Sequence, residues 1–305
     1  MRALLIRRLF TAIPTLLLVL LASFLLMRFA PGGPFDAERP LDPETRAALE
    51  ASYGLDQPLA SQFFGYLGNV LTGDFGPSLV YRDFTVTELV AQGLPLSLTL
   101  GGLATLLATM LGLAAGMSAA LRPGGLRDEA LMFASTLATA LPSFVTGPLL
   151  ALVFGLWLGL LPVGGTGGDP RYWILPVIAL ALPVAGAIAK LSRAGLASAL
   201  GGENIRTARA RGLSERAILR RHALRPALVP VVSYLGPAAA GLLTGAVIIE
   251  TVFALPGLGR YFVQGALNRD YPLIMAVILL YASLIILFNL IADLLYGWLD
   301  PRGRA

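Results

Sequence analysis

The chain has one long basic stretch in its second half, which reads Glu203-Asn-Ile-Arg-Thr-Ala-Arg-Ala-Arg-Gly-Leu-Ser-Glu-Arg-Ala-Ile-Leu-Arg-Arg-His-Ala-Leu-Arg-Pro-Ala-Leu-Val-Pro230. Apolar runs lie on both sides of this stretch, which is named the basic segment (residues 203–230) below. Its composition predicts two short helices. The first covers 205–211 and ends at Gly212, a residue type that commonly follows a helix. The second follows a cap at Ser214, because serine is a favoured N-cap residue.

Small and apolar residues alternate with the arginines of the basic segment. They are Ala208, Ala210, Leu213, Ala217 and Ile218. A plain cytosolic loop is also often basic, and a basic patch can bind anionic lipid, but neither needs an apolar face. A docking helix does, because its apolar face fills a groove while its charges fix the orientation. We therefore expect the basic segment to dock on a soluble partner.

The composition places the protein among membrane proteins. Of 305 residues, 56% are hydrophobic and only 13% are charged, whereas soluble domains carry about 25% charged residues. The mean hydropathy is +0.74. The absence of cysteine excludes disulfides and thiolate sites, and a single histidine, His222, cannot build a multi-histidine metal site. We expect no metal and no bound cofactor.

Six apolar runs predict an all-α membrane protein with six transmembrane helices. The predicted spans are 9–29, 96–121, 130–160, 173–191, 227–249 and 273–295. The first is interpreted as an uncleaved helix, because the candidate signal-peptide site has Arg28 at the position that needs a small residue, and Pro31 follows it. Pro95 stands at the start of the second span, and Pro142 and Pro148 are expected to kink the third. Glycines of the second span predict close helix packing; they are Gly101, Gly102, Gly112 and Gly116.

The charge distribution predicts that both termini lie in the cytosol. The segments assigned inside carry sixteen Lys and Arg residues and the outer loops carry six, as the positive-inside rule requires. The outer segment 31–95 has nine acidic and three basic residues, and it should contain short helices, one capped by Asp42 and one over 62–71. The expected organisation is an N-terminal transmembrane helix (1–30), this extracytoplasmic loop (31–95), a core with a cytosolic loop near 192–226 (96–296), and a cytosolic tail (297–305).

The sequence offers no catalytic machinery. The one lysine, Lys190, is not preceded by the glycine of a phosphate-binding loop, and neither a G-x-S-x-G elbow nor an H-E-x-x-H motif occurs. We therefore expect no catalytic residues and no ATP site in this chain. The near absence of charge within the spans disfavours an ion-coupled secondary transporter and an intramembrane protease.

The basic segment resembles the cytoplasmic "EAA" loop of ABC-importer permeases. Aligned on Gly212, the Glu-Ala-Ala positions hold Arg206-Thr207-Ala208, which departs from the general pattern and resembles the version in dipeptide, oligopeptide and nickel permeases. Further stretches resemble the B-type subunit of that branch over nearly the whole chain. They are Tyr53-Gly-Leu-Asp-Gln-Pro58, Gly73-Asp-Phe-Gly76, Glu250-Thr-Val-Phe-Ala-Leu-Pro-Gly-Leu-Gly259, Asn268-Arg-Asp-Tyr-Pro272 and Asp293-Leu-Leu-Tyr-Gly-Trp-Leu-Asp-Pro301.

The resemblance implies a permease subunit with the type I ABC importer fold in a bacterial or archaeal inner membrane. It would form half of a translocation path for di- or oligopeptides, and nickel chelates, glutathione and opines remain open as substrates. The implied partners are a second homologous permease, two ATP-binding subunits, an extracytoplasmic substrate-binding protein and the lipid membrane, but no nucleic acid.

The same resemblance implies two sets of contact residues. Coupling to an ATPase subunit would use Arg206, Thr207, Ala208, Arg209, Arg211, Gly212, Leu213, Ser214 and Glu215. Contact with the binding protein would use Glu250, Pro256, Gly257, Gly259, Asn268 and Asp270.

Overall fold

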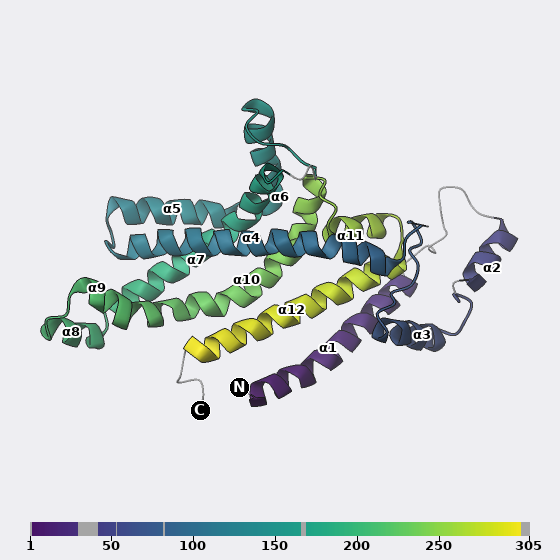
Figure 1. The fold of residues 1–305 in the computed structure, drawn as a ribbon, viewed down its shortest axis with the longest axis horizontal. Helices are drawn as coiled ribbons and strands as arrows, with labels where there is room; N and C mark the ends of the chain where they lie inside the picture. Colours follow the sequence, from purple (N-terminus) through teal and green to yellow (C-terminus); the bar gives the residue numbers. More distant parts are fainter. Residues whose placement is uncertain (1, 30–41, 53, 82, 166–168, 300–305) are drawn as a thin grey trace. The chain divides into compact units, whose positions relative to one another are not determined.

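The computed structural model describes residues 2–29, 42–52, 54–81, 83–165 and 169–299, and within these ranges the secondary structure is helical apart from one isolated bridge between Pro77 and Thr85. The predicted tail from residue 300 onward lies outside the described residues. The chain divides into two compact units. One comprises 1–5, 97–255 and 284–305, and the other comprises 6–96 and 256–283. Figure 1 shows the order of the helices along the chain.

Among the described residues, five helical segments are long and apolar enough to cross a membrane. They are 6–29 in α1 (Arg2–Phe29), α4 (Val86–Ala120), α7 (Arg171–Leu200), the continuous segment 215–252, which ends with α10 (Leu224–Val252), and 271–295 in α12 (Tyr271–Leu299). A sixth span is present if the bent pair 126–140 and 143–157 is counted as one. The all-α membrane class predicted from the sequence is therefore confirmed.

The third predicted span is broken rather than kinked, which corrects the expectation of one helix. α5 (Leu126–Ala140) and α6 (Ser143–Leu150), which continues into the π-helix η1 (Ala151–Trp157), are bent by 102° at the break between them (Figure 1). Leu141 at the break is extended, with φ −89° and ψ 116°. A residue that precedes proline is pushed out of the helical region, so Pro142 ends α5 instead of bending it.

Several helices extend beyond the apolar runs that predicted them. α4 begins at Val86, so Pro95 lies inside the helix and not at its start. α7 continues from the membrane run to Leu200 and contains Pro176 and Pro183. Membrane helices tolerate internal proline because neighbouring groups can satisfy the freed carbonyls. Hydropathy marks only the part of a helix that crosses the apolar layer, which explains the longer observed helices.

The segment 42–96 carries the two short helices that the sequence predicted. α2 (Pro43–Ser52) starts at Asp42, whose carboxylate accepts hydrogen bonds from the Thr45 amide at 2.9 Å and the Thr45 hydroxyl at 2.6 Å. These bonds lower the pKa of the Asp42 carboxyl, because they favour its charged form. α3 (Leu59–Leu71) starts slightly before the predicted 62–71. The predicted outer loop 250–271 also holds a helix, α11 (Leu258–Leu267).

Glycines of α4 bring that helix into backbone contact with its neighbours. A Cβ added at Gly112 would lie 2.6 Å from the Ile188 Cβ and 2.7 Å from the Ala185 carbonyl oxygen of α7, and one added at Gly116 would overlap Ser192 and the Ala189 carbonyl. The Ser192 hydroxyl donates across this contact to the Gly112 carbonyl at 3.3 Å. Close packing is confirmed for these glycines and for Gly101, which faces Leu243 of α10, but Gly102 has nothing within 4 Å.

Replacing Gly116 with alanine should therefore separate α4 from α7, because the new methyl group meets backbone that cannot move aside. We expect a loss of about 1–3 kcal/mol, as for other overpacked sites, measured as thermal unfolding of the detergent-solubilised chain. Gly102→Ala in the same helix is the matched control and should leave the unfolding temperature nearly unchanged. Equal behaviour of the two variants would contradict the role of Gly116.

Candidate functional site

The first helix of the basic segment, α8 (Glu203–Ala210), ends in the geometry that the sequence predicted. Gly212 has φ +76°, in the left-handed region that glycine adopts at little cost. Its amide donates to the Arg209 carbonyl at 2.9 Å, and the Leu213 amide donates to the Ala208 carbonyl at 3.2 Å. These two bonds form a Schellman motif, which satisfies the last carbonyls of α8.

The second helix, α9 (Glu215–Ile218), starts after Ser214, but the serine side chain makes no capping hydrogen bond. This corrects the predicted side-chain cap: Ser214 has the extended conformation of an N-cap, and its carbonyl accepts from the Ile218 amide at 2.9 Å. An ion pair joins the two helices instead. The Arg209 guanidinium donates to both carboxylate oxygens of Glu215, at 2.7 and 3.1 Å.

The second helix is not a separate short helix, as the sequence predicted, but continues into the next predicted span. α9 passes through the π-helix η2 (Leu219–Ala223) directly into α10. The helix that begins next to Gly212 is therefore the same continuous segment, 215–252, that crosses the membrane. A movement of the basic segment is thereby tied directly to a transmembrane span.

The apolar face of the basic segment is turned into the protein's own core. Ile205 and Ile218 are fully buried, and Ala208 is 4% exposed. They pack in one cluster with Ala120 at the end of α4 and Leu196 of α7. Of the five residues of the predicted apolar face, Ala208 and Ile218 are therefore covered by the protein itself, Leu213 and Ala217 are half-buried, and Ala210 is exposed.

The surface left for a partner is polar and basic. Its exposed arginines are Arg206, Arg209, Arg211, Arg216, Arg220, Arg221 and Arg225. Of the predicted coupling residues, Ala208 is buried and Leu213 is half-buried, whereas Thr207, Gly212, Ser214 and Glu215 are exposed with the arginines. Such a surface attracts an acidic partner electrostatically. No group of three or more potential metal ligands occurs among the described residues.

Sequence reasoning missed the ion pair between Asp128 of α5 and Arg193 of α7. The guanidinium donates to both carboxylate oxygens at 2.5 and 2.6 Å, and the Asp128 side chain is only 3% exposed. Asp128 also accepts from the amide of Gly124 at 2.9 Å, which fixes the turn between α4 and α5. Lys190 donates to the Thr139 hydroxyl at 2.9 Å. Lys190 and Arg193, two basic residues that the sequence assigned to the cytosolic side, therefore hold α7 against α5.

The predicted outer contact residues are mostly buried. Glu250 is fully buried in α10 and accepts from the Ser97 hydroxyl at 2.6 Å. Asp270, also fully buried, accepts from the Ser78 hydroxyl and, at 3.3 Å, from the Val80 amide.

Burial therefore argues against direct contact of Glu250 and Asp270 with a partner. Each has a structural role within its own unit, since both carboxylates are hydrogen-bonded in the interior. Gly257 and Gly259 are buried as well, Pro256 is half-buried, and Asn268 is exposed.

Comparison with known sequences gives matches over nearly the whole chain. A family model described as "Binding-protein-dependent transport system inner membrane component" matches residues 112–305, and a model for the N-terminal part of such membrane components matches residues 1–98. The oligopeptide transport system permease protein OppB of Haemophilus influenzae is 48% identical, with 98% of each chain covered. The dipeptide transport system permease protein DppB of Lactococcus lactis is 40% identical with the same coverage.

Among solved structures, the chain resembles a subunit of the MetNI methionine ABC transporter in an inward-facing conformation. The match has a TM-score of 0.56 at 18% identity and covers 70% of this chain and 96% of that chain. At this identity the match concerns the fold alone.

The pair of Asp128 and Arg193 offers a test of the packing between α5 and α7. Replacing Asp128 with asparagine should lower the thermal unfolding temperature, because it leaves the Arg193 cation without its carboxylate partner. The double variant with Arg193→Gln should lose less than the sum of the two single losses, since neither charge is then left alone. Strictly additive losses in this cycle would show that the two groups do not interact energetically.

Proposed function

We propose, because the chain belongs to the family of binding-protein-dependent transport system inner membrane components, that it forms half of the translocation path of an ATP-driven peptide importer. Its fold is that of type I ABC importer permeases. The observation that carries the peptide assignment is the match to oligopeptide and dipeptide permeases along 98% of both chains. Nickel chelates, glutathione and opines are the alternative cargoes.

The energy would enter through the basic segment. The sequence has no phosphate-binding loop, so we assign ATP hydrolysis to two separate subunits, one of which binds the exposed face of α8 and α9. That face carries arginines rather than an apolar ridge, so the matching groove should be lined by carboxylates. The nine predicted coupling residues remain proposals, with Ala208 assigned to packing and not to contact.

Transport would use a two-state change of the helix bundle. When the ATPase subunits close, they would displace the basic segment, and the continuous helix from 215 to 252 would carry this displacement into the membrane. The coupling is reciprocal in thermodynamic terms, so substrate delivery from outside would also favour ATPase closure.

The remaining partners follow from the same family. The family is named for its dependence on a binding protein, and we propose that this protein contacts the outer side near Asn268 and Pro256, the two predicted residues with accessible surface. The path would be completed by a second homologous permease.

The charge distribution supports cytosolic termini in a bacterial or archaeal inner membrane. The basic surface would serve a protein partner, not nucleic acid. The proposed organisation is an N-terminal transmembrane helix (1–30), an extracytoplasmic loop (31–95), a permease core (96–296) and a cytosolic tail (297–305).

Reconstitution tests this division of labour. Proteoliposomes that contain the chain, a homologous permease and two ATP-binding subunits should accumulate radiolabelled trialanine only with ATP and the binding protein. The chain alone should give neither uptake nor ATP hydrolysis, because the groups that hold nucleotide phosphates belong to other subunits. Hydrolysis by the isolated chain would contradict the assignment, and uptake of a nickel chelate without any peptide uptake would overturn the choice of cargo.

Replacing Gly212 with leucine should uncouple hydrolysis from transport. A side chain in the left-handed conformation costs about 1–2 kcal/mol, so the turn between α8 and α9 would rearrange. We expect normal insertion, continued ATP hydrolysis and a loss of trialanine uptake of about tenfold or more. Gly201→Leu is the matched control, because Gly201 has an ordinary φ of −80°. Wild-type uptake by the Gly212 variant would remove this turn from the coupling path.

A further inference from the structure

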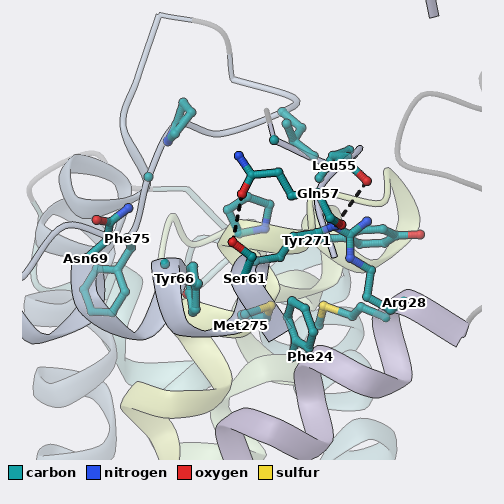
Figure 2. A pocket seen from close by; sticks show the side chains of 18 residues that line it. Phe24, Arg28, Leu55, Gln57, Ser61, Tyr66, Asn69, Phe75, Tyr271 and Met275 are labelled. Carbon is teal, nitrogen blue, oxygen red and sulfur yellow. Dashed lines mark hydrogen bonds between the residues drawn. The ribbon is translucent and has the colours of Figure 1, made fainter. Parts of the chain in front are cut away.

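A cavity of about 340 Å³ lies in the unit that contains α3. Its walls come from the end of α1, from α3, from the start of α12 and from the connecting segments 54–57 and 75–79. Figure 2 shows Phe24 and Met275 low in the cavity and Gln57 and Ser61 higher up. The volume is within the range of small-molecule sites.

The cavity is lined by residues at the ends of two candidate membrane spans, 6–29 and 271–295. Arg28 is in the last turn of α1, one residue before the end of the candidate span 6–29, and Tyr271 is the first residue of α12 and of the candidate span 271–295. Arginine and tyrosine are favoured at this level of the bilayer, where lipid phosphates lie. α3 carries exposed apolar side chains beside the cavity, with Phe64 67% and Leu71 79% exposed. A helix with such a face is suited to the membrane surface, so the cavity opens among lipid headgroups.

The lining has the chemistry of an amphiphile site. Phe24, Met27 and Met275 supply apolar surface, and the Arg28 guanidinium lies 5.8 Å from the centre of the Phe24 ring. This single cation at the wall matches one anionic group, and a phosphate is suited to arginine because several N–H donors can bind it together. The apolar surface next to the cation matches the glycerol and first acyl carbons of a lipid.

Two buried polar atoms of the lining residues have no hydrogen-bond partner among the described residues. They are Oε1 of Gln62 and the hydroxyl of Tyr66. The Gln62 amide already donates to the carbonyls of Leu55 at 3.1 Å and Gln57 at 2.6 Å, so its orientation is fixed and its oxygen needs an outside donor. Burial raises the pKa of the Tyr66 hydroxyl, so this group keeps its proton and can donate. A buried polar group without a partner requires an explanation, and a bound ligand that completes its hydrogen bonds is one.

We propose that this cavity binds a glycerophospholipid whose headgroup carries a hydroxyl, with phosphatidylglycerol as the probe. Arg28 pairs with the phosphate, and Tyr66 donates to a headgroup oxygen. The headgroup hydroxyl donates to Gln62 Oε1, and the acyl chains leave past Met27 toward the bilayer. A soluble glycerol phosphate shares the headgroup chemistry but lacks the acyl chains, and a peptide shares only the anionic end.

Native mass spectrometry of the full chain, titrated with phosphatidylglycerol in detergent, tests this proposal. Arg28→Gln should lower the bound fraction about tenfold, as expected for one lost charge-assisted hydrogen bond. Tyr66→Phe should lower it about threefold while keeping the ring in place. Arg28→Lys should retain part of the binding. Arg260→Gln is the matched control, because Arg260 is an exposed arginine of α11 that does not line the cavity.

Several outcomes would overturn the proposal. Equal retention of phosphatidylglycerol by wild type, Arg28→Gln and Tyr66→Phe would show that the cavity is not the lipid site. Arg28-dependent binding of glycerol phosphate as strong as that of the lipid would assign a soluble anion instead, and binding of trialanine without lipid binding would assign a peptide. If Arg28→Gln fails to fold, Tyr66→Phe alone decides the matter. Lipid binding can be present in a chain that imports no peptide, so this test and the uptake assay fail independently.

Discussion

The contact of α4 with α7 at Gly112 and Gly116 is the constraint on which the position of the basic segment depends. Lipid tails are as apolar as leucine, so burial of apolar side chains gives little preference for one helix over another in the membrane. Close backbone approach supplies the specificity, because only glycine leaves room for the carbonyls and the serine of α7. The same two helices present Ala120 and Leu196 at their ends, and these residues hold Ile205 and Ile218 of the basic segment.

The buried and the exposed residues of the basic segment have different roles. Its apolar residues attach it to the ends of the transmembrane helices, and its arginines remain in solvent. Docking would therefore involve charge and shape rather than a buried apolar anchor. The pairing of Arg209 with Glu215 already neutralises one of these arginines, although an exposed pair of this kind contributes little stability by itself. A mainly electrostatic contact can form and separate quickly, which suits a step that recurs in each transport cycle.

The sequence predicted local features well because their causes are local. Gly212 ends α8 since the left-handed turn needs glycine, and the glycines of α4 mark close packing since nothing larger fits. Features set by the tertiary structure were missed. Hydropathy could not show that Pro142 breaks a span, nor that Ile205 faces inward, because periodicity reveals an apolar face but not what covers it. The pair formed by Asp128 joins residues distant in sequence, and no local pattern announces it.

One continuous helical segment runs from 215 to 252, so a displacement of the basic segment can tilt the membrane span that follows it. At about 1.5 Å per residue, its 38 residues span roughly 55 Å, and no loop separates its ends. Its regular hydrogen bonding is interrupted at the π-helical η2 and at Pro230 and Pro237 inside α10. The other end carries Glu250, anchored by Ser97. A small tilt at the arginines would therefore reach that anchor as a lateral shift, reduced by the bending that η2 and the two prolines allow.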